Sequence, residues 1–495
     1  MHNPWRSQLE KLEKQARSLE TTPETRATWF QQIQQHIEAY LEGLPHWPVR
    51  EDQAEAAAEI KSWGIATQGQ ELTDILALLH RTLERQGLKP SSGGYLAYIP
   101  GGGVFPSALG DLLAAVGNHY AGFFYGSPAA VRMENLLIKW VAEFLGFDGE
   151  AVAGNLTSGG SYASLIAMHT AREAMDLQPK DQHLAVVYHS SQIHHTALKS
   201  LRVVGLSNCV FRKIPVDAAY RLSAPALRQQ IEADQQAGLR PFLILCSAGS
   251  TDVGAVDPLA DIAQIKEEYG LWMHVDAAYG GFFGLLAEIK PLFKGIEKAD
   301  SLIIDPHKGM FIALGTGMVL VRKKEWLLQA HTSTANYLQD VISPEDELSP
   351  ADLSPELSKH FRGLRMWLPL QLFGEQAFRQ ALQEKLFLAR WFYEEINIIP
   401  DIEVGPFPDL SVVLFRLKPR DTEANPANEA LLKFIQADGR VWISSTLLDG
   451  GFYLRLAVLH FRSHFEHVSH LVELIRAFTG QTASAKQSNL PQKLT

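Results

Sequence analysis

Four short segments of this 495-residue chain carry side chains that could take part in chemistry. The first, Thr157-Ser158-Gly159-Gly160-Ser161, precedes a helical pattern. Its small residues would let backbone N–H groups approach an anion at a helix N-terminus, which predicts a phosphate-binding turn. The segment lacks the lysine of a nucleoside-triphosphate loop and does not fit GxGxxG. Taken alone, it fits a plain turn with a serine cap equally well.

An acid and a lysine stand at the ends of two apolar runs. Asp276 ends the run Trp272–Asp276, so its carboxylate could face a ligand or cap a helix. Lys308 follows the run Ser301–Ile304 and precedes another apolar segment. A lysine is usually a solvated surface charge, but partial desolvation makes an amine a nucleophile by lowering its pKa.

The fourth segment, residues 190–197, contains His194 and His195. No cysteine pair or HExxH pattern accompanies them, so we expect no metal site there, and two surface histidines at a helix start are the plain alternative. A second cluster, His464, His467 and His470, has the spacing HxxHxxH. Residues i and i+6 of a helix do not share a face, so a solvated face is favoured over a metal site.

In combination and in this order, the four segments supply the groups that pyridoxal 5'-phosphate needs. The lysine would form a Schiff base with the aldehyde of the cofactor. The acid would hold a proton on the pyridine nitrogen, and the small-residue turn would bind the phosphate.

Alternating strand and helix patterns between about residues 135 and 325 must position these segments. Six buried strands are expected, at Leu184–Tyr188, Cys209–Ile214, Phe242–Ser247, Trp272–Asp276, Ser301–Ile304 and Met318–Arg322. One connecting helix begins at Ser223 and stops at Gly238, and another begins after Asp257 and stops at Gly270. The pattern predicts an α/β fold with a mostly parallel, doubly wound sheet, which binds ligands beyond the carboxyl ends of its strands.

Three further parts flank the large domain, which we place at residues 93–385. Residues 1–92 read as helices with apolar faces but no core of their own, so we expect them to dock on the main body or on a second subunit. Residues 386–480 are expected to form a small α+β domain. The polar stretch 481–495 is expected to be a disordered tail.

The composition excludes several classes of protein. A net charge of −10 argues against binding to nucleic acid or to an anionic membrane. Two cysteines exclude a disulfide framework and favour a reducing, cytoplasmic location. No apolar run reaches the roughly 20 residues of a membrane span.

The chain resembles a known family, the group II pyridoxal-phosphate-dependent amino-acid decarboxylases, which includes aromatic-amino-acid and glutamate decarboxylases. The matching segments are TSGGSYASL at 157–165, SSQIHHTALK at 190–199, HVDAAYGG at 274–281 and DPHKGMF at 305–311. The resemblance covers about residues 95–462. It implies the aminotransferase-like fold (fold type I) and a homodimer with sites at the subunit interface, clasped by the N-terminal helices.

The resemblance also implies a role for each site residue. Lys308 would bind the cofactor covalently, Asp276 would pair with the pyridinium and His194 would stack on the ring, and these three would be catalytic. Further cofactor contacts would come from Gly159, Gly160, Ser161, Thr251, Ala278 and His307. The substrate would be bound by Tyr98, Ile99, Pro100 and Arg455, although a structural ion pair fits Arg455 equally well.

The expected reaction is decarboxylation of an L-amino acid to the amine and CO2, through a Lys308 Schiff base and a quinonoid intermediate. The stretch 340–356 reads as a solvated loop, and it lacks the Tyr that protonates Cα in the animal aromatic decarboxylases, so His194 is the expected proton donor. Asp305 stands where some relatives have Asn near the phosphate, and its carboxylate is expected to turn elsewhere. Aldehyde synthesis, transamination, β-elimination and a non-catalytic scaffold remain alternatives. The substrate itself is not readable from the sequence, although an apolar or aromatic side chain is suggested.

Overall fold

The computed structural model describes residues 5–52, 54–99, 101–332, 347–418 and 424–488. The chain divides into two compact units, Met1–Ser92 and Gly93–Thr495. Within the described ranges, every helix is too short or too polar to cross a membrane.

The first unit is helical, as predicted. It contains α1 (Arg6–Ala16), α2 (Pro23–Gly43), α3 (Ala54–Trp63) and α4 (Leu72–Leu79), and β1 (Arg50–Glu51) pairs antiparallel with β2 (Gly87–Leu88). Pro23 starts α2, and the Thr22 hydroxyl accepts a hydrogen bond from the Thr25 backbone N–H. None of the residues of α1 is buried, so its apolar side chains, such as Leu9 and Leu12, are exposed.

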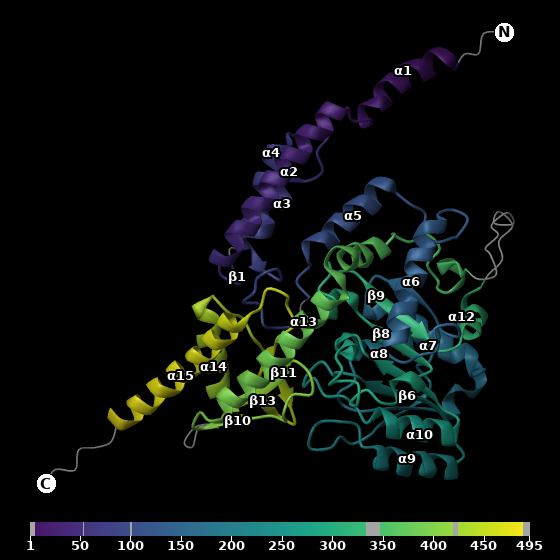
Figure 1. The fold of residues 1–495 in the computed structure, drawn as a ribbon, viewed down its shortest axis with the longest axis vertical. Helices are drawn as coiled ribbons and strands as arrows, with labels where there is room; N and C mark the ends of the chain where they lie inside the picture. Colours follow the sequence, from purple (N-terminus) through teal and green to yellow (C-terminus); the bar gives the residue numbers. More distant parts are fainter. Residues whose placement is uncertain (1–4, 53, 100, 333–346, 419–423, 489–495) are drawn as a thin grey trace. The chain divides into compact units, whose positions relative to one another are not determined.

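A seven-stranded sheet forms the centre of the second unit (Figure 1). Its strands lie in the order β3-β9-β8-β7-β6-β4-β5. Their bounds are β3 (Ala153–Thr157), β4 (Ala185–His189), β5 (Val210–Lys213), β6 (Arg240–Ser247), β7 (Trp272–Asp276), β8 (Ser301–Ile304) and β9 (Gly317–Val321). Strands β4 to β8 run parallel, and β9 is antiparallel to both β3 and β8. The mostly parallel sheet is therefore confirmed, with all six expected strands in place.

Strand β3 is not among the strands expected from the sequence. Its residues, Ala-Gly-Asn-Leu-Thr, include types with low strand propensity. All five are nevertheless buried, because β3 pairs along its whole length with β9 and is covered by helices. Tertiary packing here outweighs local preference.

Helices cover both faces of the sheet (Figure 1). On one face lie α7 (Gly160–Ala174), α8 (His195–Val203) and α12 (Lys324–His331), and on the other lie α6 (Pro128–Phe144), α9 (Ala224–Gln236) and α10 (Leu259–Tyr269). Successive residues of one strand enter opposite layers: Leu243 and Leu245 pack against the first group of helices, and Ile244 and Cys246 against the second. This alternation confirms the doubly wound architecture.

The caps of α9 and α10 differ in one respect from the prediction. The Ser223 hydroxyl accepts a hydrogen bond from the Ala226 N–H at the start of α9, as expected. At the start of α10, however, the buried Asp257 carboxylate accepts hydrogen bonds from the backbone N–H groups of Leu222 and Ser247, 2.7 Å each. It therefore ties together two loops instead of capping the helix.

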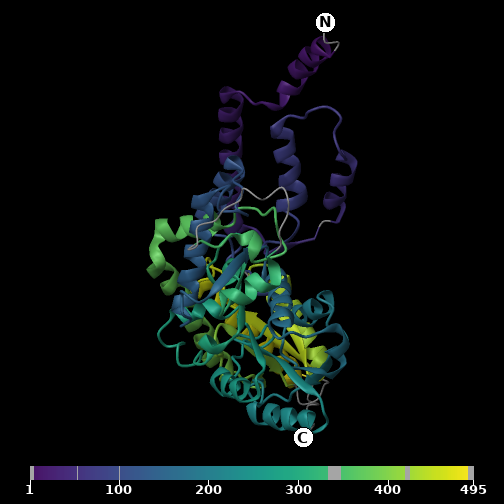
Figure 2. The same cartoon turned by 90° about the vertical axis from the view of Figure 1, so that its right-hand side faces the viewer.

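A second, antiparallel sheet has the order β10-β11-β13-β12. Its strands are β10 (Ile402–Val404), β11 (Val412–Leu417), β12 (Ser444–Leu448) and β13 (Gly451–Ala457), drawn in green and yellow in Figure 2. It forms an apolar core with α14 (Ala424–Asp438), α15 (Phe465–Ser488) and the second half of α13 (Gly363–Asn397). This confirms the small α+β part of the fold.

One helix of this part of the chain is interrupted, and another is longer than expected. Gly374 in α13 has φ 71° and ψ 158°, which breaks the long helical run into a pair. Helix α15 continues to Ser488, although a disordered tail was expected from residue 481. The residues concerned, QTASAKQS, include good helix formers such as Ala, Gln and Lys, which explains the continuation.

Candidate active site

A cavity of about 490 Å³ lies beyond the carboxyl ends of the parallel strands. Parallel strands end at the same edge of a sheet, so the loops that follow β4, β6, β7 and β8 meet there. All nine residues predicted to bind the cofactor line this cavity: Gly159, Gly160, Ser161, His194, Thr251, Asp276, Ala278, His307 and Lys308. The structure thus brings together residues from five separate segments of the chain.

The predicted phosphate turn joins β3 to α7. The Thr157 hydroxyl donates a hydrogen bond to the Gly159 carbonyl, 3.0 Å away, and Gly160 is the first residue of α7. The first backbone N–H groups of a helix have no partner within it, so they can bind an anion here. A Cβ atom on Gly160 would come within 2.9 Å of the Asp305 carboxylate, so glycine is required at this position.

Asp276 ends β7 at the bottom of the cavity. Its Oδ1 accepts a hydrogen bond from the Ala278 backbone N–H at 3.0 Å. Burial raises the pKa of Asp276, whereas the positive charge of Lys308 and the Ala278 N–H lower it. A carboxylate in this position gains from a nearby cation, and the protonated nitrogen of a pyridine ring would be one.

Lys308 lies in the short helix α11 (Pro306–Gly309), directly after β8. Its Nζ lies 3.0 Å from Oδ2 of Asp305, whose side chain is buried. The Asp305 carboxylate therefore turns to the lysine. His307 donates a hydrogen bond from Nδ1 to the Thr316 carbonyl at 2.6 Å, which leaves Nε2 as the ring nitrogen on the side of Asp305, 3.9 Å from Oδ2.

His194 is the residue that precedes α8. Its Nδ1 lies 2.5 Å from the Thr196 hydroxyl, and its ring centroid lies 4.3 Å from that of His195. Burial lowers the pKa of His194 to about 4, and the charges of His195 and Lys308 act in the same direction. The imidazolium form is therefore scarce at neutral pH, which argues against the expected role of His194 as the acid that protonates Cα.

Of the residues predicted to bind substrate, the described ones, Tyr98, Ile99 and Arg455, are not among those that line the cavity. Tyr98 is 63% exposed and Ile99 is buried, and both have a left-handed backbone, with φ values of 54° and 57°. Pro100 lies outside the described residues.

Arg455 is bound to other parts of the protein by hydrogen bonds. Its guanidinium donates hydrogen bonds to the carbonyl oxygens of Thr251 and Asp252 and to the Ser444 hydroxyl, so all three of its nitrogens are occupied. These partners are neutral oxygens and not the acid of the expected structural ion pair, and through them Arg455 holds in place the segment that carries Thr251.

Several residues of the cavity wall were not predicted from the sequence, among them Tyr162, Thr196, Leu314 and Gly315. Tyr162 follows the phosphate turn directly, and Thr196 stands two residues after His194, so proximity to predicted residues could have indicated both. Leu314 and Gly315 follow α11 in a loop that carries no sequence signal. The Arg365 guanidinium in α13 donates hydrogen bonds to the carbonyl oxygens of both residues at 3.2 Å.

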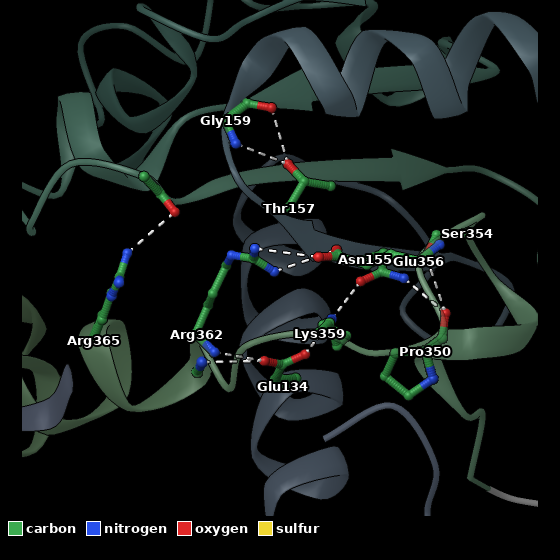
Figure 3. A network of polar contacts seen from close by, with 12 residues as sticks. Glu134, Asn155, Thr157, Gly159, Pro350, Ser354, Glu356, Lys359, Arg362 and Arg365 are labelled. Carbon is green, nitrogen blue, oxygen red and sulfur yellow. Dashed lines mark hydrogen bonds and ion pairs between the residues drawn. The ribbon is translucent and has the colours of Figure 1, made fainter. Parts of the chain in front are cut away.

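A buried ion pair between Lys359 and Glu134 lies near the strand that leads into the phosphate turn (Figure 3). Lys359 Nζ lies 2.7 Å from the Glu134 carboxylate in α6 and 2.6 Å from the Asn155 side-chain oxygen in β3. Asn155 in turn donates to the Pro350 carbonyl at 2.9 Å. Because β3 leads directly into the phosphate turn, this network fixes the base of that turn.

The structure also differs from the prediction of a solvated loop at 340–356. Residues 340–346 lie outside the described residues. In the described part, Glu347 is ion-paired with Arg132 at 2.8 Å and accepts a hydrogen bond from Asn135 at 2.9 Å. Leu353 is buried, so residues 347–356 are packed on the protein and the prediction was wrong for them.

The histidines of the HxxHxxH pattern bind separate partners. His464 contacts Glu384 at 2.7 Å, and His470 contacts Asp438 at 2.9 Å. The side chain of His470 is only 15% exposed, so the face is less solvated than expected. In the described ranges, no group of three or more His, Cys, Asp or Glu residues could hold a metal ion.

Residues 61–418 match the family described as "Pyridoxal-dependent decarboxylase conserved domain". The chain belongs to this family. It is therefore a pyridoxal-phosphate-dependent carboxy-lyase, and pyridoxal phosphate is its cofactor.

Similar proteins include an aromatic-L-amino-acid decarboxylase of Bacillus atrophaeus, 31% identical over 85% of this chain and 88% of that protein. A phenylacetaldehyde synthase of Petunia hybrida is 28% identical over 79% of this chain and 80% of its own length. The crystal structure of Catharanthus roseus tryptophan decarboxylase with L-tryptophan has a TM-score of 0.84 and 26% identity, and covers 93% of this chain and 99% of that one.

The cavity of this decarboxylase fits the cofactor. It combines a glycine-containing anion turn, a buried acid, a lysine and a histidine ring within about 490 Å³. The phosphate would lie at Gly159, Gly160 and Ser161, the ring nitrogen at Asp276 and the aldehyde at Lys308.

Proposed function

We propose that this enzyme converts an L-amino acid with an apolar or aromatic side chain into the corresponding amine and CO2. The observation that carries the proposal is the meeting of Lys308, Asp276, His194 and the phosphate turn in one cavity. The substrate class is supported by the 31% identical relative, which is an aromatic-L-amino-acid decarboxylase.

Different residues of the cavity would have different roles in the reaction. When bound, pyridoxal phosphate supplies an electron sink for the bond that breaks at Cα. The backbone N–H groups at Gly159 to Ser161 would bind the phosphate, and Asp276 would hold a proton on the ring nitrogen. Lys308 Nζ would attach the cofactor and give way to the amine of the substrate.

The proton that replaces CO2 at Cα needs a donor within the cavity. His194 is neutral at ordinary pH because burial lowers its pKa to about 4. Lys308 Nζ lies in the same cavity, ion-paired with Asp305 at 3.0 Å. We therefore assign the proton transfer to Lys308 and leave His194 to pack against the ring.

Aldehyde formation is the second candidate. It is favoured by the similarity to the Petunia phenylacetaldehyde synthase, which covers 79% of the chain. In both reactions CO2 is lost, so CO2 release alone does not distinguish them, although aldehyde formation also consumes O2 and water and releases ammonia and H2O2. The organic product does, because one reaction yields an amine and the other an aldehyde.

The enzyme is proposed to act as a homodimer. Helix α5 (Phe105–Gly117) exposes an apolar stripe at helical spacing, formed by Phe105, Leu109, Leu112, Leu113 and Val116 with exposures of 39–73%. A surface helix normally buries such a face against another element. Tyr98, which is 63% exposed, precedes α5 in the chain, so a partner subunit seated on this helix could receive its side chain at its own site.

The decisive experiment tests the covalent link. The purified protein is loaded with pyridoxal phosphate, reduced with borohydride and digested, and the modified peptide is located by mass spectrometry. We expect the pyridoxyl group on Lys308, and amine and CO2 from at least one L-amino acid of a panel. The Lys308→Ala variant should form no product. A modification at another lysine, or full turnover by Lys308→Ala, would overturn the proposal.

A further inference from the structure

Thr196 makes a short polar contact with His194. Its hydroxyl oxygen lies 2.5 Å from His194 Nδ1, and both residues line the cavity. Thr196 is the second residue of α8, and His194 precedes that helix, so the backbone holds the two side chains in a fixed relation. The contact leaves Nε2 as the ring nitrogen that is available to a molecule in the cavity.

The position of the single proton on the His194 ring decides whether Nε2 is a hydrogen-bond donor or an acceptor. A neutral imidazole carries a single proton, on Nδ1 or on Nε2, and a threonine hydroxyl also has a single proton to donate. Among the described residues, His194 is the hydrogen-bond partner of the Thr196 hydroxyl, and no carbonyl there accepts the hydroxyl proton. This proton therefore points to Nδ1, and the proton of the ring is then on Nε2.

Thr170 in α7 shows the opposite case within the same chain. Its hydroxyl donates to the Ile166 carbonyl at 2.8 Å, and the same oxygen lies 3.2 Å from His331 Nε2. Because the hydroxyl proton is already used, His331 must be the donor to Thr170. The two Thr–His pairs therefore differ in direction, and the reason is the presence or absence of a backbone acceptor.

We propose that Thr196 is a positioning residue that donates to Nδ1 of His194, fixes the Nε2–H tautomer and so presents an N–H donor to the molecule in the cavity. The inference deepens the proposed function, since the donor would face the cofactor and substrate. The hydrogen bond also fixes the orientation of the His194 ring. A ring that packs against the cofactor must keep one orientation, and the bond to Thr196 prevents it from flipping.

The test is the tautomer itself. The holoenzyme is labelled with ¹⁵N-histidine, and the His194 signals are assigned by their loss in His194→Asn. In the wild type we expect an unprotonated Nδ1 and a protonated Nε2. Thr196→Val keeps the shape but removes the hydroxyl, so the two tautomers should mix. Thr196→Ser keeps the hydroxyl and should restore the wild-type signals.

Thr170→Val is the matched control. It should move the signals of His331 and leave those of His194 unchanged. Thr196→Val should also lower kcat/KM about tenfold, the effect of losing one hydrogen bond. A protonated Nδ1 in the wild type, or unchanged His194 signals in Thr196→Val, would overturn the proposal. These readouts do not depend on which product forms, so they fail separately from the decarboxylase assignment.

Discussion

Burial sets the charge of the titratable side chains in the cavity, and it acts on them in opposite directions. It raises the pKa of Asp276 and lowers the pKa of His194 to about 4. Both shifts disfavour the charged form, as expected where water is excluded. The cavity therefore tolerates charge in pairs, such as Lys308 with Asp305. A cation at the cofactor ring would complete a second pair with Asp276.

Replacing Asp276 tests this pairing. Asp276→Asn keeps the size of the side chain but removes the charge that holds a proton on the ring nitrogen. We expect kcat for amine formation to fall by at least about 10²-fold, the scale of removing one preorganised electrostatic group. The matched control is Asp257→Asn, a second buried acid outside the cavity, which should affect stability more than kcat. A nearly normal kcat for Asp276→Asn would contradict the assigned role.

At the scale of elements, buried polar contacts hold the walls of the cavity. Lys359 connects the segment before α13 with α6 and β3 (Figure 3). Arg365 in α13 holds the loop with Leu314 and Gly315, and Arg455 in β13 holds the loop with Thr251. The Arg365 and Arg455 contacts join a remote element to a loop that lines the cavity, and the Lys359 contacts support β3, which leads into the phosphate turn. The site thus depends on elements that contribute no residue to the chemistry.

The Lys359–Glu134 pair gives a prediction for stability. Lys359→Met would leave the Glu134 carboxylate buried without its partner, which typically costs about 3–5 kcal/mol. The free energy of unfolding, measured by denaturant titration, should fall by about this amount. The double variant Glu134→Gln/Lys359→Met removes both charges and should recover part of the loss. Equal losses in both variants would show that packing, and not charge, dominates here.

At the scale of the whole molecule, α5 gives a prediction for assembly. Leu113 is 56% exposed in the middle of the apolar stripe. Leu113→Asp should place a charge in the dimer interface and produce monomers, as measured by sedimentation. Ile398→Asp, a change at a 74% exposed apolar residue far along the chain, serves as control and should leave the oligomeric state unchanged. If Leu113→Asp remains a dimer, α5 is not the dimer interface.

The stability of the molecule should also depend on pH. His274 is fully buried, and burial lowers its pKa to about 3, from an ordinary value near 6.5. Below pH 6.5 the unfolded chain binds a proton at this residue and the folded chain does not, so stability falls as the pH falls. The loss is about 1.4 kcal/mol per pH unit for such a histidine. Asp257 opposes it, because burial raises its pKa to about 6 and the folded state then binds the extra proton.

Thermal unfolding at pH 7 and pH 5 measures this dependence. The wild type should unfold at a lower temperature at pH 5, because His194 and His331 titrate in the same direction as His274, with pKa values lowered to about 4. His274→Asn removes one such group, so its midpoint should change less between the two pH values. An equal change in both proteins would exclude His274 as a source of the pH dependence.

The cytoplasmic location, suggested by two free cysteines, stays a prediction, which cell fractionation would test.

The sequence by itself determined the fold class and the residues expected to bind the cofactor. Buried parallel strands read as apolar runs, and the loops after them must meet at one edge of the sheet, so the order of the segments was enough to place Lys308 and Asp276 together, whereas Thr251 was indicated by the resemblance to the family. Gly159 and Gly160 could be found in the same way, because an anion turn needs small residues. These features depend on local pattern and on topology.

Tertiary structure alone decided the contacts between distant segments. Nothing near Arg455 in the sequence indicates that it binds the carbonyl oxygens of Thr251 and Asp252, or that Lys359 is buried against Glu134. The strand β3 and the burial of Leu353 likewise depend on neighbours that lie far away in the chain. Side-chain partners and burial follow from packing in three dimensions, and one-dimensional spacing carries no record of them.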